Sequence, residues 1–421
     1  MSLSRIAEES PWTSTHALLL ASFSVSSAVE AYVYSLPYIA ETWASFSPPL
    51  LALFSAWAPL WILLGGAFAG PISDALGRKR AFYLTMTMYV AGGTALILSA
   101  GPLEILASLS VLLFAAGGEY QNVLVAAHEL APRRRRSAML FLALNFTNLG
   151  GALAALLSLM SYTDPDHQRI VLGATVVISA ALLAIMRNRM PESVAWLERK
   201  GRADEAEREI RRYYGGISAL SAQHERIELP GVLFRIAVGG LLGWSYTSVL
   251  SLVVLTLGPY FYPSMTDLII FAAGISMFVS GLIGVVADRM SRKALLLASS
   301  ILSLLTLTAM ALTQDIWAEN FILFIILLML FSALLNVFFL SEDALKSEFW
   351  PTRRRGLYTS AVRIISLGGS IPVLVIAAGL SETEYFALAM LAMLVGVVCS
   401  VLWFRYGPET GRGASISSWD L

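Results

Sequence analysis

Long uncharged runs, separated by short charged loops, constrain the fold of this sequence most strongly. Residues 50–69 and 81–103 carry no charge, and they flank the charged segment GPISDALGRKR at positions 70–80. About 20 apolar residues in a helix cross the roughly 30 Å hydrocarbon core of a bilayer, so each run is long enough to span it. Only 14% of the residues are charged and 57% are hydrophobic, whereas soluble domains carry about 25% charged residues. We therefore expect an all-α membrane protein.

The apolar runs predict twelve transmembrane helices. Of the 29 Lys and Arg residues, only Arg169 falls in a loop on one side of the predicted membrane, and the others cluster on the opposite side. Because cytoplasmic loops are enriched in Lys and Arg, both termini are expected on the cytoplasmic side of the cell (plasma) membrane. The expected spans are residues 14–40, 50–73, 81–102, 104–128, 137–160, 169–187, 232–257, 266–288, 294–313, 318–341, 356–380 and 384–405.

Three motifs occur twice, in the same order. The repeated pairs lie about 217 residues apart, with offsets of 214, 219 and 217 residues. An internal duplication at one spacing is typical of transporters built from two parallel halves. The pairs are GPISDALGRK at 70–79 with GVVADRMSRK at 284–293, ELAPRRRRS at 129–137 with EFWPTRRRG at 348–356, and PES at 191–193 with PET at 408–410.

The first motif, G-x-x-x-D-x-x-G-R-K, resembles the signature loop of the major facilitator superfamily of transporters. In physical terms, Gly70 lets two helices approach closely, Gly77 permits a sharp turn, and Asp74 can sit against the positive end of a neighbouring helix. The resemblance implies that the repeated motifs form a gate. The candidate gating residues are Gly70, Asp74, Gly77, Arg78, Lys79, Glu129, Arg136 and Glu192 in the first copy and Asp288, Arg289, Arg292, Lys293, Glu348, Arg355 and Glu409 in the second.

The duplication and the resemblance together predict the major facilitator fold, in which twelve transmembrane helices form two pseudo-symmetric six-helix bundles. The N-terminal bundle is expected at residues 1–187, and the C-terminal bundle with a cytoplasmic tail at residues 232–421. Residues 188–231 are expected to be a cytoplasmic linker that contains an amphipathic helix at 204–214, where opposite charges four residues apart support a surface helix.

Three ionisable residues lie inside the predicted hydrocarbon layer: Glu30, Glu119 and Arg363. At 1.5 Å per residue, each lies roughly 12–16 Å from the nearest charged loop. A charge at this depth costs about 2.5–3.5 kcal/mol on insertion scales, so such residues usually face a cavity or each other. A static buried ion pair that only joins helices is the alternative interpretation.

The sequence around these charges resembles one branch of the superfamily, the niacin, aromatic-acid and organic-ion transporters, which is related to the sugar porters. Its features here are Gly117-Gly118-Glu119 before the E-x-x-P motif, and Arg363 after the second arginine cluster. The resemblance implies that Arg363 binds the carboxylate of a small organic anion, aromatic acids included, and that Glu30 or Glu119 carries the coupling proton of a symporter. The fourth helix lacks the arginine that often precedes its glycines in sugar porters.

Further polar and aromatic residues on the expected cavity helices are candidates for substrate binding. Each could equally serve interhelical packing or hydrogen bonding. The candidates besides Arg363 are Tyr34, Asn122, Asn145, Asn148, Trp244, Tyr246 and Asn336.

Other classes of function lack support in the sequence. It contains no phosphate-binding G-x-x-x-x-G-K-S/T loop and no His or Cys pair at metal-ligand spacing. We therefore expect a transporter that works by alternating access, and no enzyme, cofactor, metal site or nucleic-acid partner. The expected partners are a small-molecule substrate, a proton and the lipid bilayer, and the chain is expected to be monomeric. The alternatives are a sugar or polyol porter, a multidrug exporter, and a receptor that binds a ligand without moving it.

Overall fold

The computed structural model describes residues 3–40, 43, 48–160, 162, 164–214, 229–348, 350, 354–377 and 379–411. Within this part of the chain every regular element is a helix, and twelve helical segments are long and apolar enough to cross a membrane. The predicted all-α fold with twelve transmembrane helices is confirmed, and the observed spans begin and end close to the predicted positions.

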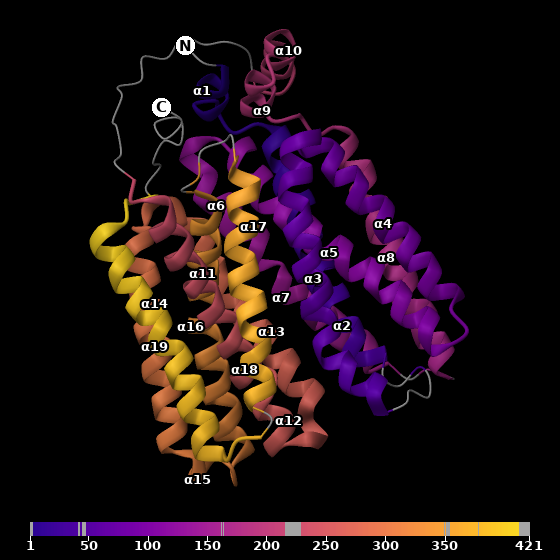
Figure 1. Ribbon diagram of the computed structural model, residues 1–421, viewed down its shortest axis with the longest axis vertical. Coiled ribbons are helices and arrows are strands. Elements are labelled where there is room, and N and C mark those ends of the chain that lie inside the picture. The colour runs from indigo at the N-terminus through magenta and orange to yellow at the C-terminus, as the bar shows by residue number, and fades with distance from the viewer. Residues whose placement is uncertain are drawn as a thin grey trace.

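The first six spans pack together as the N-terminal half (Figure 1). Their shared core includes Phe82, Leu112 and Leu183, all fully buried. The fifth span is divided where Phe146 separates two helices. The elements are α2 (Ser14–Ala40), α3 (Pro48–Leu76), α4 (Arg78–Leu98), α5 (Pro102–Leu130), η1 (Arg133–Arg135), α6 (Arg136–Asn145), α7 (Thr147–Ser158) and α8 (Pro165–Asn188).

The last six spans form the C-terminal half around a second core, which includes Leu242, Phe331 and Trp403. Two of these spans contain a π-helical turn, a feature that often occurs at functional sites. The elements are α11 (Val232–Val249), the π-helical η2 (Leu250–Val254), α12 (Leu257–Phe261), η3 (Pro263–Met265), α13 (Thr266–Gly281), η4 (Leu282–Arg289), α14 (Arg292–Leu312), α15 (Gln314–Trp317), α16 (Phe321–Glu348), α17 (Arg355–Arg363), the π-helical η6 (Ile364–Gly368), α18 (Gly369–Ala377) and α19 (Glu382–Tyr406).

Three short helices lie beyond one end of the membrane-spanning helices: α1 (Leu3–Glu8), α9 (Val194–Arg199) and α10 (Ala203–Tyr213) (Figure 1). They share a small apolar core that includes Ile6, Trp196 and Ile210. The helix expected at 204–214 corresponds to α10. The carboxylate of Glu198 accepts hydrogen bonds from the backbone N–H groups of Leu3 and Ser4, so α1 is attached to α9.

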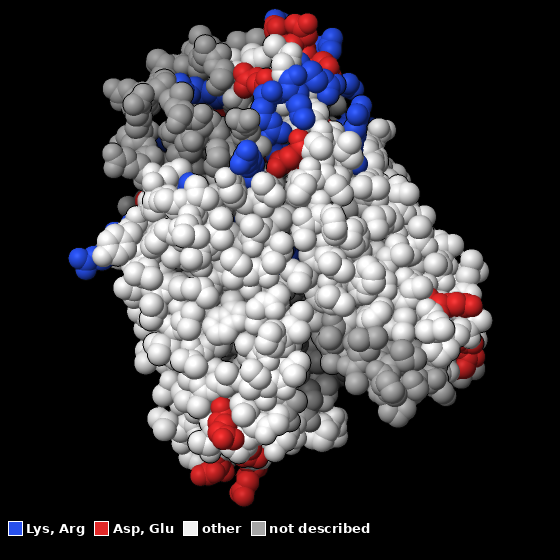
Figure 2. All heavy atoms as spheres, in the orientation of Figure 1, with Lys and Arg blue, Asp and Glu red and all other residues white. Residues whose placement is uncertain are grey.

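Cations gather at the end of the molecule that carries α9 and α10, and a broad uncharged band separates them from acidic residues at the opposite end (Figure 2). This segregation agrees with the loop charges on which the topology prediction rests. Which end faces the cytoplasm stays a prediction. We call this the cationic end, defined by Arg78, Lys79, Arg136, Arg292, Lys293 and Arg355.

The two halves touch closely at the cationic end, where α3 packs along α17 and α6 packs along η4. The backbones of α3 and α17 come together at Gly70 and Gly356. A Cβ atom on Gly70 would lie 2.2 Å from the carbonyl oxygen of Gly356 and 2.4 Å from the hydroxyl of Ser360. Only glycine fits at this position, so the helix approach expected from the motif occurs between the two halves.

Candidate functional site

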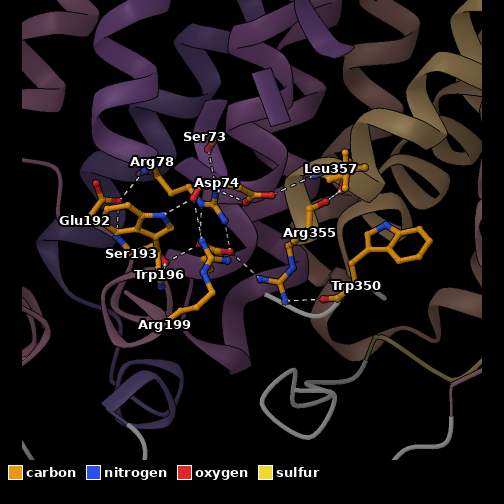
Figure 3. Close-up of polar contacts among 12 residues, drawn as sticks. Ser73, Asp74, Arg78, Glu192, Ser193, Trp196, Arg199, Trp350, Arg355 and Leu357 are labelled. Atoms are coloured by element: carbon orange, nitrogen blue, oxygen red, sulfur yellow. Dashed lines mark hydrogen bonds and ion pairs between the residues drawn. The ribbon is translucent and has the colours of Figure 1, made fainter. Parts of the chain in front are cut away.

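Arg78 is the centre of the first charged cluster at the cationic end. Its side chain is fully buried and lies 2.9 Å from Asp74 and 2.8 Å from Glu129. The guanidinium donates two parallel hydrogen bonds to Glu129. These bonds hold the guanidinium in one orientation in addition to pairing its charge. Figure 3 shows the Arg78 side chain directed toward Asp74.

Two contacts extend this cluster from the N-terminal half to the C-terminal half. Arg355, at the start of α17, lies 3.1 Å from the same Glu129 carboxylate. The second oxygen of Asp74 accepts a hydrogen bond at 3.3 Å from the backbone N–H of Leu357, in the first turn of α17 (Figure 3). A carboxylate at a helix N-terminus is favoured by the unpaired N–H groups and the helix dipole. Together these contacts hold the cationic end closed.

Glu192 of the PES motif caps the turn between α3 and α4. Its carboxylate accepts hydrogen bonds from the backbone N–H groups of Arg78 at 2.9 Å and Lys79 at 3.2 Å. Burial raises the pKa of Glu192, and these N–H donors act against that rise. Gly77 has φ +96°, a conformation that suits glycine, and a Cβ there would lie 2.6 Å from the Glu192 carboxylate. Lys79 Nζ donates to the carbonyls of Asn188 and Met190.

The second copy repeats most of these contacts. Arg292 lies 2.9 Å from Glu348, and its backbone N–H donates to Glu409 at 2.9 Å. Lys293 Nζ donates to the carbonyl of Gly407 at 2.7 Å. Asp288 accepts a hydrogen bond at 3.2 Å from the backbone N–H of Ala138, in the first turn of α6. Both aspartates of the motif thus lie at the N-terminus of a helix of the opposite half.

The second copy also departs from the first. Ser291, in the place of Gly77, has φ −75° and caps α14 with its side chain, so this turn does not require glycine. Arg289 is exposed. Arg136, the counterpart of Arg355, binds Glu8 of α1 at 3.0 Å.

A central cavity of about 240 Å³ lies between the halves. Arg363 and Glu30 line it, with 3.6 Å between their nearest charged atoms. The Arg363 guanidinium also stacks over the ring of Tyr120, 4.3 Å from its centroid. The Tyr120 hydroxyl donates a short hydrogen bond to Asp343, which lies on α16 of the C-terminal half. Both π-helical turns, η2 and η6, contribute to the wall.

The structure places the predicted substrate-binding residues in three groups. Tyr34, Asn148 and Tyr246 line the cavity with Arg363. Asn145 and Asn336 instead hydrogen-bond across the halves at 3.2 Å, and Asn148 joins Asn336 at 2.9 Å. The remaining two residues are not among the described residues that line the cavity. Asn122 is buried in α5. The indole N–H of Trp244 donates a hydrogen bond to the Gly369 carbonyl at 2.8 Å.

Glu30 and Glu119, the two predicted proton carriers, have different surroundings. Glu30 lines the cavity. Glu119 is fully buried within the N-terminal half, 2.5 Å from Arg187 of α8, and it accepts hydrogen bonds from Ser26 and Thr85. Among the described residues, Glu119 is absent from the cavity wall and has no contact with Arg363.

The buried charged residues Arg187, Glu342, Asp343 and Lys346 were not recognised from the sequence. Their positions explain this, because hydropathy ends the sixth span at residue 187 and the tenth at residue 341. Helix α16 continues to Glu348. The spacing of Glu342, Asp343 and Lys346, which places Lys346 three and four residues after the acids, was the signal that could have revealed an ion-paired group.

Comparison with known proteins agrees with this architecture. The family described as "Sugar (and other) transporter" matches residues 20–410. The inner membrane metabolite transport protein YgcS of Escherichia coli is 26% identical over 86% of this chain and 84% of its own length. The glucose transporter GlcP of Staphylococcus epidermidis is 26% identical over 84% of each chain.

A solved structure shows the same fold. The proton:xylose symporter XylE of E. coli, bound to 6-bromo-6-deoxy-D-glucose, aligns with a TM-score of 0.81 over 97% of this chain and 98% of its own, at 15% identity. At 15% sequence identity, this similarity is evidence of a shared fold.

Proposed function

Because this chain belongs to the sugar (and other) transporter family of the major facilitator superfamily, we propose that it moves a small, uncharged polar solute of the sugar or polyol type across the cell membrane. The observation that carries the proposal is the charge balance of the central cavity. Arg363, the cation expected to bind an anionic substrate, is already paired with Glu30, and Lys346, the other cation of the described wall, is paired with Asp343.

The expected organic-anion substrate is less well supported than the sugar alternative. An entering carboxylate would have to displace Glu30 from Arg363 or Asp343 from Lys346, because both cations of the described wall already have a carboxylate partner. The two relatives described above, which align over more than four fifths of this chain, are named for glucose and for an unspecified metabolite. A solute without charge requires no such displacement, so a sugar-type substrate fits the cavity better.

The uncharged part of the cavity wall suits a polyhydroxyl compound. Tyr34 and Tyr246 offer phenolic hydroxyls beside aromatic faces, and Asn148 offers an amide. These groups both donate and accept hydrogen bonds, as the hydroxyls of a sugar require. Small-molecule sites combine such placed polar groups with apolar walls.

The mechanism we propose is rocking of the two halves around this cavity. The contacts of Asp74 and Asp288 with helices of the opposite half would break when the cationic end opens. We propose that this end is cytoplasmic, and that residues 1–187, 188–231 and 232–421 act as the first half, the linker and the second half. The gating residues named from the sequence would set how stable the closed state is.

Proton coupling is part of the proposal, with Glu30 as the stronger of the two sequence candidates. Glu30 reaches the cavity and its counter-ion Arg363 belongs to the other half, so its charge balance changes when the halves move. Glu119 and Arg187 both belong to the N-terminal half, so rocking leaves their pair together.

Uptake by proteoliposomes that contain the purified protein tests the function. Counterflow should be detected with a member of a panel of labelled monosaccharides and polyols, and an inward proton gradient should raise its accumulation. Saturable counterflow of a small carboxylate such as nicotinate or benzoate, lost in Arg363→Ala, would instead support the organic-anion candidate. Binding of a solute without any counterflow would support the receptor alternative.

A further inference from the structure

Helix α16 carries a buried charged triad beside the cavity, formed by Glu342, Asp343 and Lys346. Lys346 Nζ lies 2.8 Å from a carboxylate oxygen of Glu342 and 2.8 Å from one of Asp343. Glu342 and Asp343 are each 1% exposed. Asp343 and Lys346 reach the cavity wall. The triad is separate from Glu30, which lies on α2 in the other half.

The triad has one more acid than it has cations. Arg363 of α17 is the other cation of the described cavity wall, and it is paired with Glu30 of α2. Tyr120 of α5 donates a hydrogen bond to Asp343, and Tyr246 of α11 lines the same cavity, but a phenol supplies no positive charge. Among the described residues, three carboxyl groups therefore share two cations. An uncompensated charge is costly inside a bilayer, and two carboxyl groups that share a site do not both ionise readily.

We propose that the α16 triad binds one exchangeable proton, and that Glu342 holds it in this conformation. The hydrogen bonds distinguish the two acids. Asp343 accepts from both Lys346 and the Tyr120 hydroxyl, which stabilises its ionised form. Among the described residues, Lys346 is the one donor to Glu342. Protonation of Glu342 therefore disturbs fewer hydrogen bonds than protonation of Asp343 would.

The position of the triad links this proton to the movement of the halves. Tyr120 belongs to the N-terminal half and Asp343 to the C-terminal half, so their hydrogen bond breaks if the halves separate there. Asp343 then loses a donor, and the affinity of the triad for its proton rises. By linkage, protonation favours the separated state to the same extent. This consequence, unlike the site itself, rests on the proposed rocking mechanism.

Infrared difference spectroscopy of the purified full-length protein in D2O tests the proton site without any solute. The C=O stretch of a buried carboxylic acid should appear at neutral pH and disappear as the pH is raised. Glu342→Gln and Asp343→Asn should each lose this band, because the remaining carboxylate neutralises Lys346. Lys346→Met should roughly double the band, because both acids are then protonated. Glu382→Gln, which alters an exposed acid at the opposite end, is the matched control and should leave the band unchanged.

Three results would overturn the proposal. They are a wild-type protein without the band, a band that persists in both acid variants, and a wild-type band that appears in choline buffer and vanishes in sodium buffer. The last would mean that a sodium ion takes the place of the proton. Opposite changes of the band in the acid and lysine variants cannot arise from misfolding, which the thermal unfolding midpoint checks separately. Because no solute is used, failure of this test leaves the counterflow result to decide the transport function.

Discussion

Glu8 on α1 and Arg136 at the start of α6 form an ion pair with 3.0 Å between their nearest charged atoms. The counterpart of Arg136 in the second copy, Arg355, crosses to the other half and binds Glu129 at 3.1 Å. By the same symmetry Arg136 would bind Glu348, and Oε2 of Glu348 is buried without a hydrogen-bond partner among the described residues. Helix α1 therefore holds an arginine that could otherwise join the halves.

The first prediction is that Glu8→Gln stabilises the closed cationic end. Arg136 would turn to Glu348 and add a second bridge between the halves. A gain of about 1 kcal/mol, the usual net value of one hydrogen bond, would slow opening roughly fivefold. Hydrogen–deuterium exchange of residues 136–145 should slow accordingly. Glu9→Gln, which breaks the neighbouring pair with Arg133, is the control and should have little effect. Faster exchange in Glu8→Gln would show that α1 supports closure.

The second prediction concerns the aspartates at the helix N-termini. Asp74→Asn and Asp288→Asn should weaken the closed state, because the neutral amide interacts less with the helix dipole, by roughly 0.3–1 kcal/mol. Both variants should act in the same direction, since each aspartate contacts a helix of the opposite half. Transport should fall while solute binding is largely kept, measured as counterflow and as equilibrium binding. Loss of binding with unchanged amide exchange at the start of α17 would place Asp74 in the substrate site instead.

The third prediction is that Gly70→Ala prevents tight closure of the cationic end. The added methyl group would lie 2.2 Å from the Gly356 carbonyl oxygen, so α3 and α17 must move apart. We expect faster exchange of the amides in α17 and a loss of transport, with the fold retained. Gly101→Ala is the matched control, because a Cβ there meets no atom within 4 Å. Equal transport by both variants would contradict the closed contact.

The fourth prediction separates stability from transport at Glu119. Glu119→Gln should lower the free energy of unfolding by about 3–5 kcal/mol, because it leaves Arg187 buried without its counter-charge. Glu119→Gln combined with Arg187→Met should regain most of that loss, as measured by thermal unfolding. The pH dependence of transport should stay unchanged in the double variant. A shifted pH profile would restore Glu119 as a proton carrier.

The local structure of the gate motifs could be predicted from their sequence. Gly70, Asp74 and Gly77 were interpreted from the needs of close approach, a helix N-terminus and a sharp turn, and the structure places each in such a setting. Each of these requirements can be inferred from the motif itself, and the duplication presents the motif twice. The sequence offered no reason to expect Arg136 to bind Glu8, because their pairing depends on where a short separate helix docks.

Sequence alone determined the class, the twelve spans and the duplication, because apolar run length and repeated motifs follow directly from residue order. Only the tertiary structure decided which buried charges meet. Glu30 and Glu119 looked equivalent by depth, yet Glu30 faces Arg363 across the halves and Glu119 faces Arg187 within one half. Which arginine each glutamate meets depends on the rotation of its helix about the helix axis. The α16 triad escaped notice because its charges end a hydropathic run, and only packing shows that its ion pairs are buried beside the cavity.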